Sequence, residues 1–290
     1  MKKGFLAHGM TTCAGCTMEL IARTVFDTLG EKTIVVIPPG CAAILAGYSL
    51  ETPLELPVVM SNLEATAAFA AGIRAGLEAQ GKNDVNVLGF AGDGGTADIG
   101  LQSLSGAVER GDRILYVCYD NEAYMNTGIQ GSGSTPLGAW TTTTPGGKAS
   151  RRKDLGLIMD AHGIPYVATA SPAYLEDLAK KVAKAAATPG PSFIHVHTPC
   201  PTGWRFPTAK GIEIARLAVR TGMWVIYERV NGVLEVNIKP AKRLPVTEYL
   251  KTQGRFAGIG EEQVAAMQAD VDRTWSQLAA SGEVLQSAGA

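Results

Sequence analysis

The sequence has no excess of charge of either sign and no long apolar run. Its 290 residues include 26 Lys and Arg against 27 Asp and Glu, for a formal net charge of -1. This balance gives no electrostatic reason to expect a nucleic acid or a membrane surface as a partner. The most apolar stretch, 65–73, is interrupted by Arg74 and is far shorter than the roughly 20 residues of a spanning helix. A globular chain that binds small molecules or proteins is expected.

The sequence also lacks a recognisable secretory signal, because MKKGFLAHGM contains only a short apolar run. A cytoplasmic chain is therefore expected. Its five cysteines then argue against a disulfide framework, since the cytosol keeps thiols reduced. Metal binding or redox chemistry becomes the leading use for the C-x-x-C pair Cys13 and Cys16, for Cys41 and for Cys200. Cys118 lies inside an expected strand and is interpreted as a small buried apolar residue.

The order of segments along the chain predicts an α/β fold with a parallel sheet and helices on both faces. Strands are expected at 33–37, 84–90, 113–119, 166–169 and 192–197, and helices at 61–80, 96–109, 151–162 and 172–187. The Gly, Ser and Thr-rich loop 121–150 is long enough to suggest a functional role.

The last part of the chain reads as an addition to this α/β unit. A helix near 208–221, a hairpin turning at Asn231-Gly232 and a polar helix at 261–281 are expected there. We therefore divide the chain into an α/β domain at 1–205 and a C-terminal extension at 206–290 that serves packing or subunit contacts.

Two neighbouring strand ends carry unusual residues, and ligands of open α/β sheets bind at such ends. One end offers GDGG at 92–95, where the glycines let backbone amides approach a phosphate and Asp93 offers a hard carboxylate for Mg²⁺. Asn121 follows the next strand and could supply an amide oxygen to the same ion. A GDG sequence alone is an ordinary turn, but with the Asn-containing strand end it predicts a diphosphate held through Mg²⁺.

A resemblance to a known family adds to this prediction. GDGGTADIG at 92–100, followed by CYDNEAYMNTGIQ at 118–130, resembles the thiamine diphosphate motif of the β subunit of 2-oxoacid:ferredoxin oxidoreductases, the pyruvate synthase group. The resemblance extends to HGMTTCAGC at 8–16, VIPPGC at 36–41, TTTTPGGK at 141–148, HGIPYVATA at 162–170 and HTPCPTGW at 197–204. It implies the parallel-sheet thiamine diphosphate-binding fold for the first 205 residues.

The resemblance also implies roles for individual residues. Asp93 and Asn121 would bind Mg²⁺ through their side chains and Ala123 through its carbonyl. The residues expected beside the diphosphate are Gly92, Gly94 and Gly95, and those expected to touch cofactor or substrate are Asn126, Thr127, Ile129 and Gln130. One [4Fe-4S] cluster would be held by Cys13, Cys16, Cys41 and Cys200.

These cofactors fit one reaction. Decarboxylation of a 2-oxoacid leaves a carbanion that thiamine stabilises, and oxidising it requires an acceptor for two electrons, which a nearby iron-sulfur cluster takes one at a time. Four thiolates taken alone suit structural zinc equally well. A zinc-stabilised, non-catalytic binding subunit is therefore the alternative from a different class. A non-oxidative thiamine decarboxylase would have no use for the four cysteines.

The chain has a single thiamine-type motif, so the resemblance implies that a partner α subunit supplies the activating Glu. The further subunits expected are a γ subunit and a ferredoxin-like δ subunit. The expected co-substrate is coenzyme A, and the expected electron acceptor is ferredoxin. Pyruvate is the first choice of 2-oxoacid; phenylglyoxylate, a branched-chain 2-oxoacid and oxalate are alternatives. Gly131 stands where the family commonly has a basic residue, which suggests a roomier pocket.

Other polar and aromatic residues are given structural roles. His8, His195 and His197 are interpreted as structural or exposed, and Glu122 as an exposed or outer-sphere carboxylate beside the metal ligand. Trp140 and Trp204 are expected either at subunit contacts or at the pocket.

Overall fold

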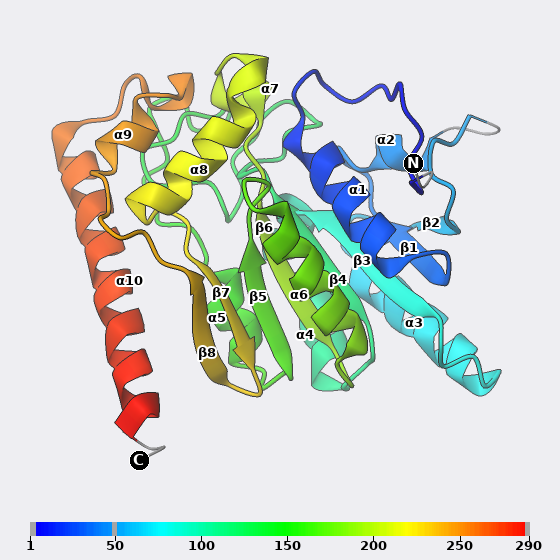
Figure 1. Cartoon of the computed structure of the whole chain (residues 1–290). Coiled ribbons are helices and arrows are strands. Elements are labelled where there is room, and N and C mark those ends of the chain that lie inside the picture. The colour runs from blue at the N-terminus through cyan, green and yellow to red at the C-terminus, as the bar shows by residue number, and fades with distance from the viewer. Residues whose placement is uncertain (1–3, 48–50, 288–290) are drawn as a thin grey trace.

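An eight-stranded sheet forms the middle layer of the molecule (Figure 1). The computed structural model describes residues 4–47 and 51–287, with side chains up to residue 279. The strand order is β2-β1-β3-β4-β6-β5-β7-β8; the first six strands in this order run parallel, and β7 and β8 are antiparallel to their neighbours. The strands are β1 Thr33–Ile37, β2 Val58–Met60, β3 Asn86–Gly92, β4 Leu115–Asp120, β5 Tyr166–Ala170, β6 Ser192–His197, β7 Ile226–Val230 and β8 Val233–Ile238.

The central strands are buried on both faces, which explains why they read as continuous apolar runs in the sequence. In β1, Val35 and Ile37 pack into one hydrophobic core while Val36 packs into the other. This alternation is the two-residue period of a strand between two layers of helices. The predicted mostly parallel α/β fold is confirmed.

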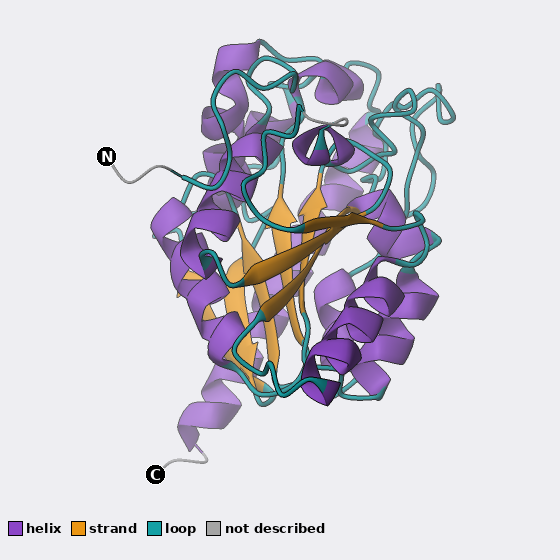
Figure 2. Cartoon of the chain, turned by 90° about the vertical axis from the view of Figure 1, so that its right-hand side faces the viewer, coloured by secondary structure: helices purple, strands orange, loops and turns teal. Residues whose placement is uncertain are grey.

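Helices cover both faces of the sheet, as Figure 2 shows from the side. Helices α1 Thr17–Leu29 and α6 Leu175–Ala187 lie in contact on one face, and α3 Thr66–Ala79, α4 Leu101–Glu109 and α5 Leu155–Asp160 lie on the other (Figure 1). The remaining helices are α2 Ala43–Ala46, α7 Pro201–Trp204, α8 Gly211–Thr221, α9 Thr247–Leu250 and α10 Glu261–Ser287, with a π-helical turn at Gly94–Asp98 and 3-10 turns at Thr208–Lys210 and Gly254–Phe256.

Two predicted helix starts were wrong for local reasons. The capping box at Ser61 and Glu64 does not form; α3 begins five residues later, and the Ser61 hydroxyl lies 3.2 Å from the Thr66 hydroxyl instead. The second helix is expected to start at residue 96, but that residue lies in the π-helical turn Gly94–Asp98, and α4 starts at Leu101. A wider π-helical turn is common at functional sites. Helix α1 and strand β2 were not predicted at all.

The C-terminal extension packs against the same sheet. Strand β7 pairs with β5, so the predicted hairpin at 226–238 extends the sheet by two strands. A third hydrophobic core joins Trp204, Trp224 and Tyr249 to α8 and α10. Whether residues 206–290 also make subunit contacts stays a prediction. Within the described ranges, no helix is both long and apolar enough to cross a membrane.

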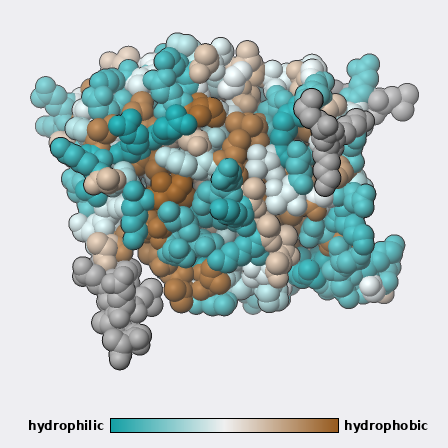
Figure 3. All heavy atoms as spheres, viewed as in Figure 1, coloured by the Kyte–Doolittle hydropathy of each residue, from teal (hydrophilic) through white to brown (hydrophobic). Residues whose placement is uncertain are grey.

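Part of the surface is apolar. In the view of Figure 3, apolar side chains reach the surface along the area where α8 and β8 lie, between polar neighbours. Val233, the first residue of β8, has 52% of its surface exposed. An edge strand with apolar side chains is a site at which proteins associate.

We expect the packing of α1 on the sheet to be essential for stability. Phe26 of α1 is fully buried and its ring meets Phe90 of β3 edge-on, with centroids 5.5 Å apart. Truncating Phe26 to Ala should lower the free energy of unfolding by about 3–5 kcal/mol, because the lost contacts leave a cavity. Phe69→Ala is the matched control, since Phe69 is 39% exposed. Denaturant unfolding of both variants measures the difference, and equal losses would contradict this account.

Candidate functional site

Four neighbouring strands bring the predicted site residues to one edge of the sheet. Strands β1, β3, β4 and β6 lie side by side and parallel, so their carboxyl ends meet at the same edge. Cys41 follows β1, Asp93 follows β3, Asn121 follows β4 and Cys200 follows β6. The edge at which α/β proteins bind their ligands therefore carries both sets of predicted ligands.

Three oxygen-bearing groups converge at the ends of β3 and β4. The inward end of the Asn121 amide lies 2.8 Å from the Ala123 carbonyl oxygen and 3.1 Å from Asp93 Oδ1. Without a cation this end must be the NH₂ group, which donates to both oxygens. With the carbonyl oxygen there instead, three oxygens face one another, which is stable only around a cation. Adjacent ligands of an octahedral Mg²⁺ at about 2.1 Å are themselves about 3.0 Å apart, so the spacing fits.

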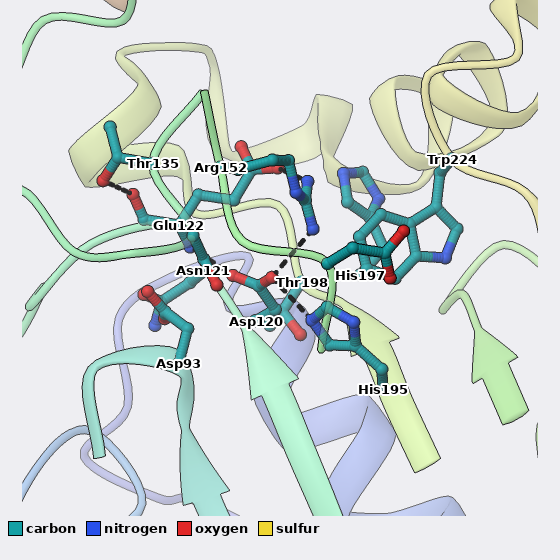
Figure 4. A network of polar contacts seen from close by, with 12 residues as sticks. Asp93, Asp120, Asn121, Glu122, Thr135, Arg152, His195, His197, Thr198 and Trp224 are labelled. Carbon is teal, nitrogen blue, oxygen red and sulfur yellow. Dashed lines mark hydrogen bonds and ion pairs between the residues drawn. The ribbon is translucent and has the colours of Figure 1, made fainter. Parts of the chain in front are cut away.

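Asp93 is fully buried, and its surroundings bear on its charge. Its second oxygen, Oδ2, accepts a 2.5 Å hydrogen bond from the Ser132 hydroxyl. Burial, followed by the nearby carboxylate of Asp120, raises the pKa of Asp93 well above its usual range. Burial disfavours the negative charge of this carboxylate, and a bound cation would compensate that charge. The Asp93 and Asn121 side chains point toward each other from neighbouring strands (Figure 4).

The glycine-rich turn leaves no room for side chains on its inner side. A Cβ atom on Gly94 would collide with the ring of Tyr124, and one on Gly92 would lie 3.1 Å from the ring of Tyr119. The Tyr124 hydroxyl donates to the Gly94 carbonyl at 3.2 Å. Gly95 lies in the buried π-helical turn that follows Asp93. The backbone here is close-packed at the start of a helical segment, and contact of these glycines with a diphosphate stays a prediction.

The turn after Ala123 carries the four residues that are predicted to touch cofactor or substrate. Asn126 and Thr127 are exposed, and the Thr127 hydroxyl donates to the Gln130 side chain at 2.7 Å. Ile129 has a positive φ of 65°, which shapes the turn. These residues do not contact Asp93 or Asn121 among the described contacts, so contact with a cofactor or substrate stays a prediction for them.

The three segments that carry the four predicted cluster cysteines are tied to their neighbours by hydrogen bonds near those cysteines. The Cys16 amide donates to the Cys13 carbonyl at 3.0 Å, which closes the C-x-x-C turn. Thr17 donates to the Pro199 carbonyl at 2.9 Å and so joins the start of α1 to the segment before Cys200. The Ala42 amide donates to the Tyr119 hydroxyl at 3.1 Å, which holds the segment after Cys41 against β4.

The thiols are close enough for their charges to interact. Burial raises the pKa of Cys16 to about 11 and that of Cys41 to about 12, and the other three thiols add to the rise at Cys41. The Asp93 carboxylate adds to the rise at Cys41 as well, in keeping with the positions of the two residues after the adjacent strands β1 and β3. The Cys200 sulfur accepts a 3.4 Å hydrogen bond from the Gly203 amide. Among the described residues, no three His, Cys, Asp or Glu side chains are near enough to hold a metal as they stand.

A buried charge network surrounds Asn121 (Figure 4). Asp120 accepts from His195 Nε2 at 2.7 Å and from Arg152 at 3.1 Å. Burial alone would raise the pKa of Asp120, but the His195 hydrogen bond and the Arg152 charge outweigh it and keep that pKa low. Glu122 pairs with Arg152 at 2.8 Å and with Arg255 at 2.6 Å. Of the two roles expected for Glu122, an exposed or an outer-sphere carboxylate, burial excludes the first, since Glu122 is 3% exposed.

Several residues of this site gave no signal in the sequence. Ser132 and Thr135 come from the long loop, Arg152 from the segment just before α5, and Arg255 from the C-terminal extension. Of the residues given structural roles, His8 is exposed, His195 and His197 are buried, and Trp140 lies under the Arg205 guanidinium at 3.5 Å. Trp204 is fully buried and its indole donates to the Asn121 carbonyl at 2.8 Å, so it serves the site directly.

A cavity of about 500 Å³ lies next to this network. Its lining includes Arg152, His195 and Trp224, together with Met267 and Val271 of α10. Its lining includes neither Asp93 nor Asn121 nor any of the cysteines. The converging oxygens and the thiols therefore form a site separate from this cavity.

The comparisons with known proteins agree with this geometry. Residues 40–196 match the family described as thiamine pyrophosphate enzyme, C-terminal TPP binding domain. A pyruvate synthase subunit PorB from Methanothermobacter thermautotrophicus is 51% identical over 94% of this chain and 97% of its own length. A ketoisovalerate oxidoreductase subunit VorB from Pyrococcus horikoshii is 49% identical over 95% of this chain and 93% of its own length.

A solved structure supports the same fold. A chain of the 2-oxoglutarate:ferredoxin oxidoreductase from Magnetococcus marinus, with 2-oxoglutarate, coenzyme A and succinyl-CoA bound, superposes with a TM-score of 0.60. It is 20% identical, and the match covers 73% of this chain and 79% of that one. Given the relatives at about half identity over nearly the whole chain, this chain belongs to the family of β subunits of 2-oxoacid:ferredoxin oxidoreductases.

Proposed function

We propose that this chain is the thiamine diphosphate- and [4Fe-4S]-binding β subunit of an enzyme that oxidatively decarboxylates pyruvate to acetyl-coenzyme A and CO₂. One observation carries the proposal: three converging oxygen-bearing groups lie beside four cysteines at one edge of the sheet. Zinc bound by the cysteines would leave the oxygens of Asp93, Asn121 and Ala123 without a purpose. A thiamine site without a redox centre would leave the four cysteines without a role.

In this proposal the chain's residues have distinct tasks. Asp93, Asn121 and the Ala123 carbonyl bind Mg²⁺, and the Ser132 hydroxyl fixes the second oxygen of Asp93. The glycines at 92, 94 and 95 admit the diphosphate to the backbone. Cys13, Cys16, Cys41 and Cys200 ligate the cluster. Thiamine diphosphate, when bound, supplies the electron sink for decarboxylation, and the protein excludes water and orients the reacting groups.

The partners follow from the family and from the surface. As a β subunit, the chain works with other subunits; an α subunit is proposed to supply the activating Glu, and γ and ferredoxin-like δ subunits to complete the complex. The apolar area along α8 and β8 is a suitable contact surface. Coenzyme A is the proposed co-substrate and ferredoxin the proposed acceptor. A cytoplasmic location stays a prediction.

A branched-chain 2-oxoacid is the second candidate substrate. Relatives named for pyruvate and for ketoisovalerate are almost equally similar to this chain, at 51% and 49% identity. Gly131 in place of a basic residue would suit the larger substrate. The two relatives reported above are named for neither phenylglyoxylate nor oxalate.

The complex purified anaerobically from its host tests the function. We expect one thiamine and about four irons per β chain in addition to the irons of the ferredoxin-like δ subunit, and bleaching of the cluster absorbance when pyruvate is added with coenzyme A. Bleaching by 2-ketoisovalerate in preference to pyruvate would select the second candidate. Zinc without thiamine, and no response to any 2-oxoacid, would reject the enzyme and leave the zinc-stabilised binding subunit.

Neutralising Asp93 should abolish metal-dependent cofactor binding. In Asp93→Asn we expect the dissociation constant for Mg²⁺ with thiamine diphosphate to rise more than about 100-fold, since even residues behind a ligand account for 10–100-fold. Calorimetric titration of the complex measures it. Asp112→Asn is the control, because Asp112 pairs with Arg110 away from the site. Iron content should be unchanged in both variants; equal Mg²⁺ affinities would contradict the assignment.

Two cysteine variants separate a cluster ligand from a buried cysteine. Cys41→Ala should lower the iron content by about four per β chain and weaken the brown absorbance accordingly, while thiamine diphosphate still binds. Cys118→Ala should keep the brown absorbance and the iron, because Cys118 is a residue of β4 that is fully buried in a hydrophobic core. Iron and sulfide analysis with visible spectra distinguishes them. Retention of all iron in Cys41→Ala would show that Cys41 is no ligand.

A further inference from the structure

The residue between two proposed Mg²⁺ ligands has an unfavourable backbone conformation. Glu122 has a positive φ of 64°, although it is not a glycine. This left-handed conformation brings Cβ too close to the neighbouring carbonyl oxygen. Residues in such conformations persist only where the surrounding structure holds them. At this position the bend carries the chain from Asn121 to Ala123, whose oxygen-bearing groups converge at 2.8 Å.

Each polar group of Glu122 has a partner. Its amide donates to Asp120 Oδ1 at 2.9 Å, and its carbonyl accepts from the Thr135 hydroxyl at 2.6 Å. Its two carboxylate oxygens accept from Arg152 at 2.8 Å and from Arg255 at 2.6 Å. Figure 4 shows Thr135 and Arg152 approaching Glu122 from different sides. These four contacts fix both the backbone and the side chain of this one residue.

Arg255 gives this arrangement a rigid support. Its side chain is 2% exposed and lies 3.7 Å above the ring of Trp204. The Trp204 indole donates to the Asn121 carbonyl at 2.8 Å. The Arg255 carbonyl accepts from the Trp140 amide at 2.8 Å. A residue of the C-terminal extension therefore contacts Glu122 directly and reaches Asn121 through the Trp204 indole.

The charges in this region balance so that one carboxylate is left for a cation. Arg152 and Arg255 neutralise Asp120 and Glu122, and Asp93 has a hydroxyl partner but no cationic side chain among its described contacts. Removing Arg255 would make the region more negative. Electrostatics alone would then predict tighter cation binding.

We propose that Glu122 is a positioning residue for the Mg²⁺ site, and that Arg152 and Arg255 act through it by holding the left-handed bend that aims Asn121 and Ala123 at Asp93. This inference rests on the proposed function, because it takes those three residues as the ligands. It also gives the C-terminal extension a role in the site, through Arg255.

The first test compares two truncations that both remove the carboxylate. Glycine adopts a positive φ without penalty, whereas alanine does not. Both variants are titrated with Mn²⁺ in place of Mg²⁺. If the bend matters, Glu122→Ala should raise the dissociation constant for Mn²⁺ about tenfold or more, the effect typical of mutating a residue that supports a metal ligand. Glu122→Gly should raise it by clearly less. If only the charge matters, the two variants should bind alike, which would overturn the proposal.

The second test removes one cation. Arg255→Met should weaken Mn²⁺ binding by about tenfold, while an electrostatic role predicts tighter binding. Arg243→Met is the matched control, because Arg243 pairs with Asp272 at 2.8 Å and lies over Trp275 within the same C-terminal extension. Its Mn²⁺ affinity should stay within about twofold of the native value. Unchanged or tighter binding in Arg255→Met would also overturn the proposal.

Both tests use the whole complex, stripped of metal with a chelator and titrated with Mn²⁺ in the presence of thiamine diphosphate. Free Mn²⁺ is counted by electron paramagnetic resonance, so the readout does not depend on turnover. Melting temperatures without metal report folding, and if Arg255→Met fails to assemble, the Glu122 pair decides. A native complex that binds no Mn²⁺ would reject the proposed site itself, whereas a native complex that binds with unaffected variants would reject only the positioning role.

Discussion

Parallel pairing of four neighbouring strands is the constraint on which the candidate site depends. Because β1, β3, β4 and β6 run in the same direction and in adjacent positions, every residue that follows them comes to one edge. Asp93 and Asn121 lie far apart in the sequence, and Cys41 and Cys200 farther still. The register Gly92 opposite Tyr119 sets how far the ends of β3 and β4 extend, and hence which residues face each other.

Burial of charge is the second determinant of the site. Asp93, Asp120 and Glu122 are all almost completely inaccessible, and unpaired carboxylates are very unfavourable in such surroundings. Asp120 and Glu122 are paired with Arg152, Arg255 and His195, which come from three distant segments. The long loop 121–150 is thus ordered by hydrogen bonds to the strand ends, including those of Ser132 and Thr135.

The sequence was informative where a local pattern determines the structure. The runs TIVVI and SFIHVH predicted β1 and β6 to the residue, and the glycines with Asp93 indicated the edge that carries the candidate site. Arg255 could not be found in this way, since its partner Glu122 is 133 residues away and no pattern connects them. Helix α3 begins late because Ser61 forms a hydrogen bond to the Thr66 side chain rather than capping the helix. Local propensity says nothing about a contact as distant in the sequence as that of Arg255 with Glu122.

The support of Glu122 also limits how this part of the molecule can change during evolution. Residues 122, 152 and 255 belong to three segments, yet Glu122 pairs with both arginines, and Arg152 also pairs with Asp120. A mutation that removes Glu122 leaves two arginines beside one carboxylate, so a second change that removes an arginine would restore the balance of charge. Among related chains these three positions should therefore be replaced jointly, and a lineage that acquires glycine at position 122 would be freed from keeping either arginine for the sake of the bend.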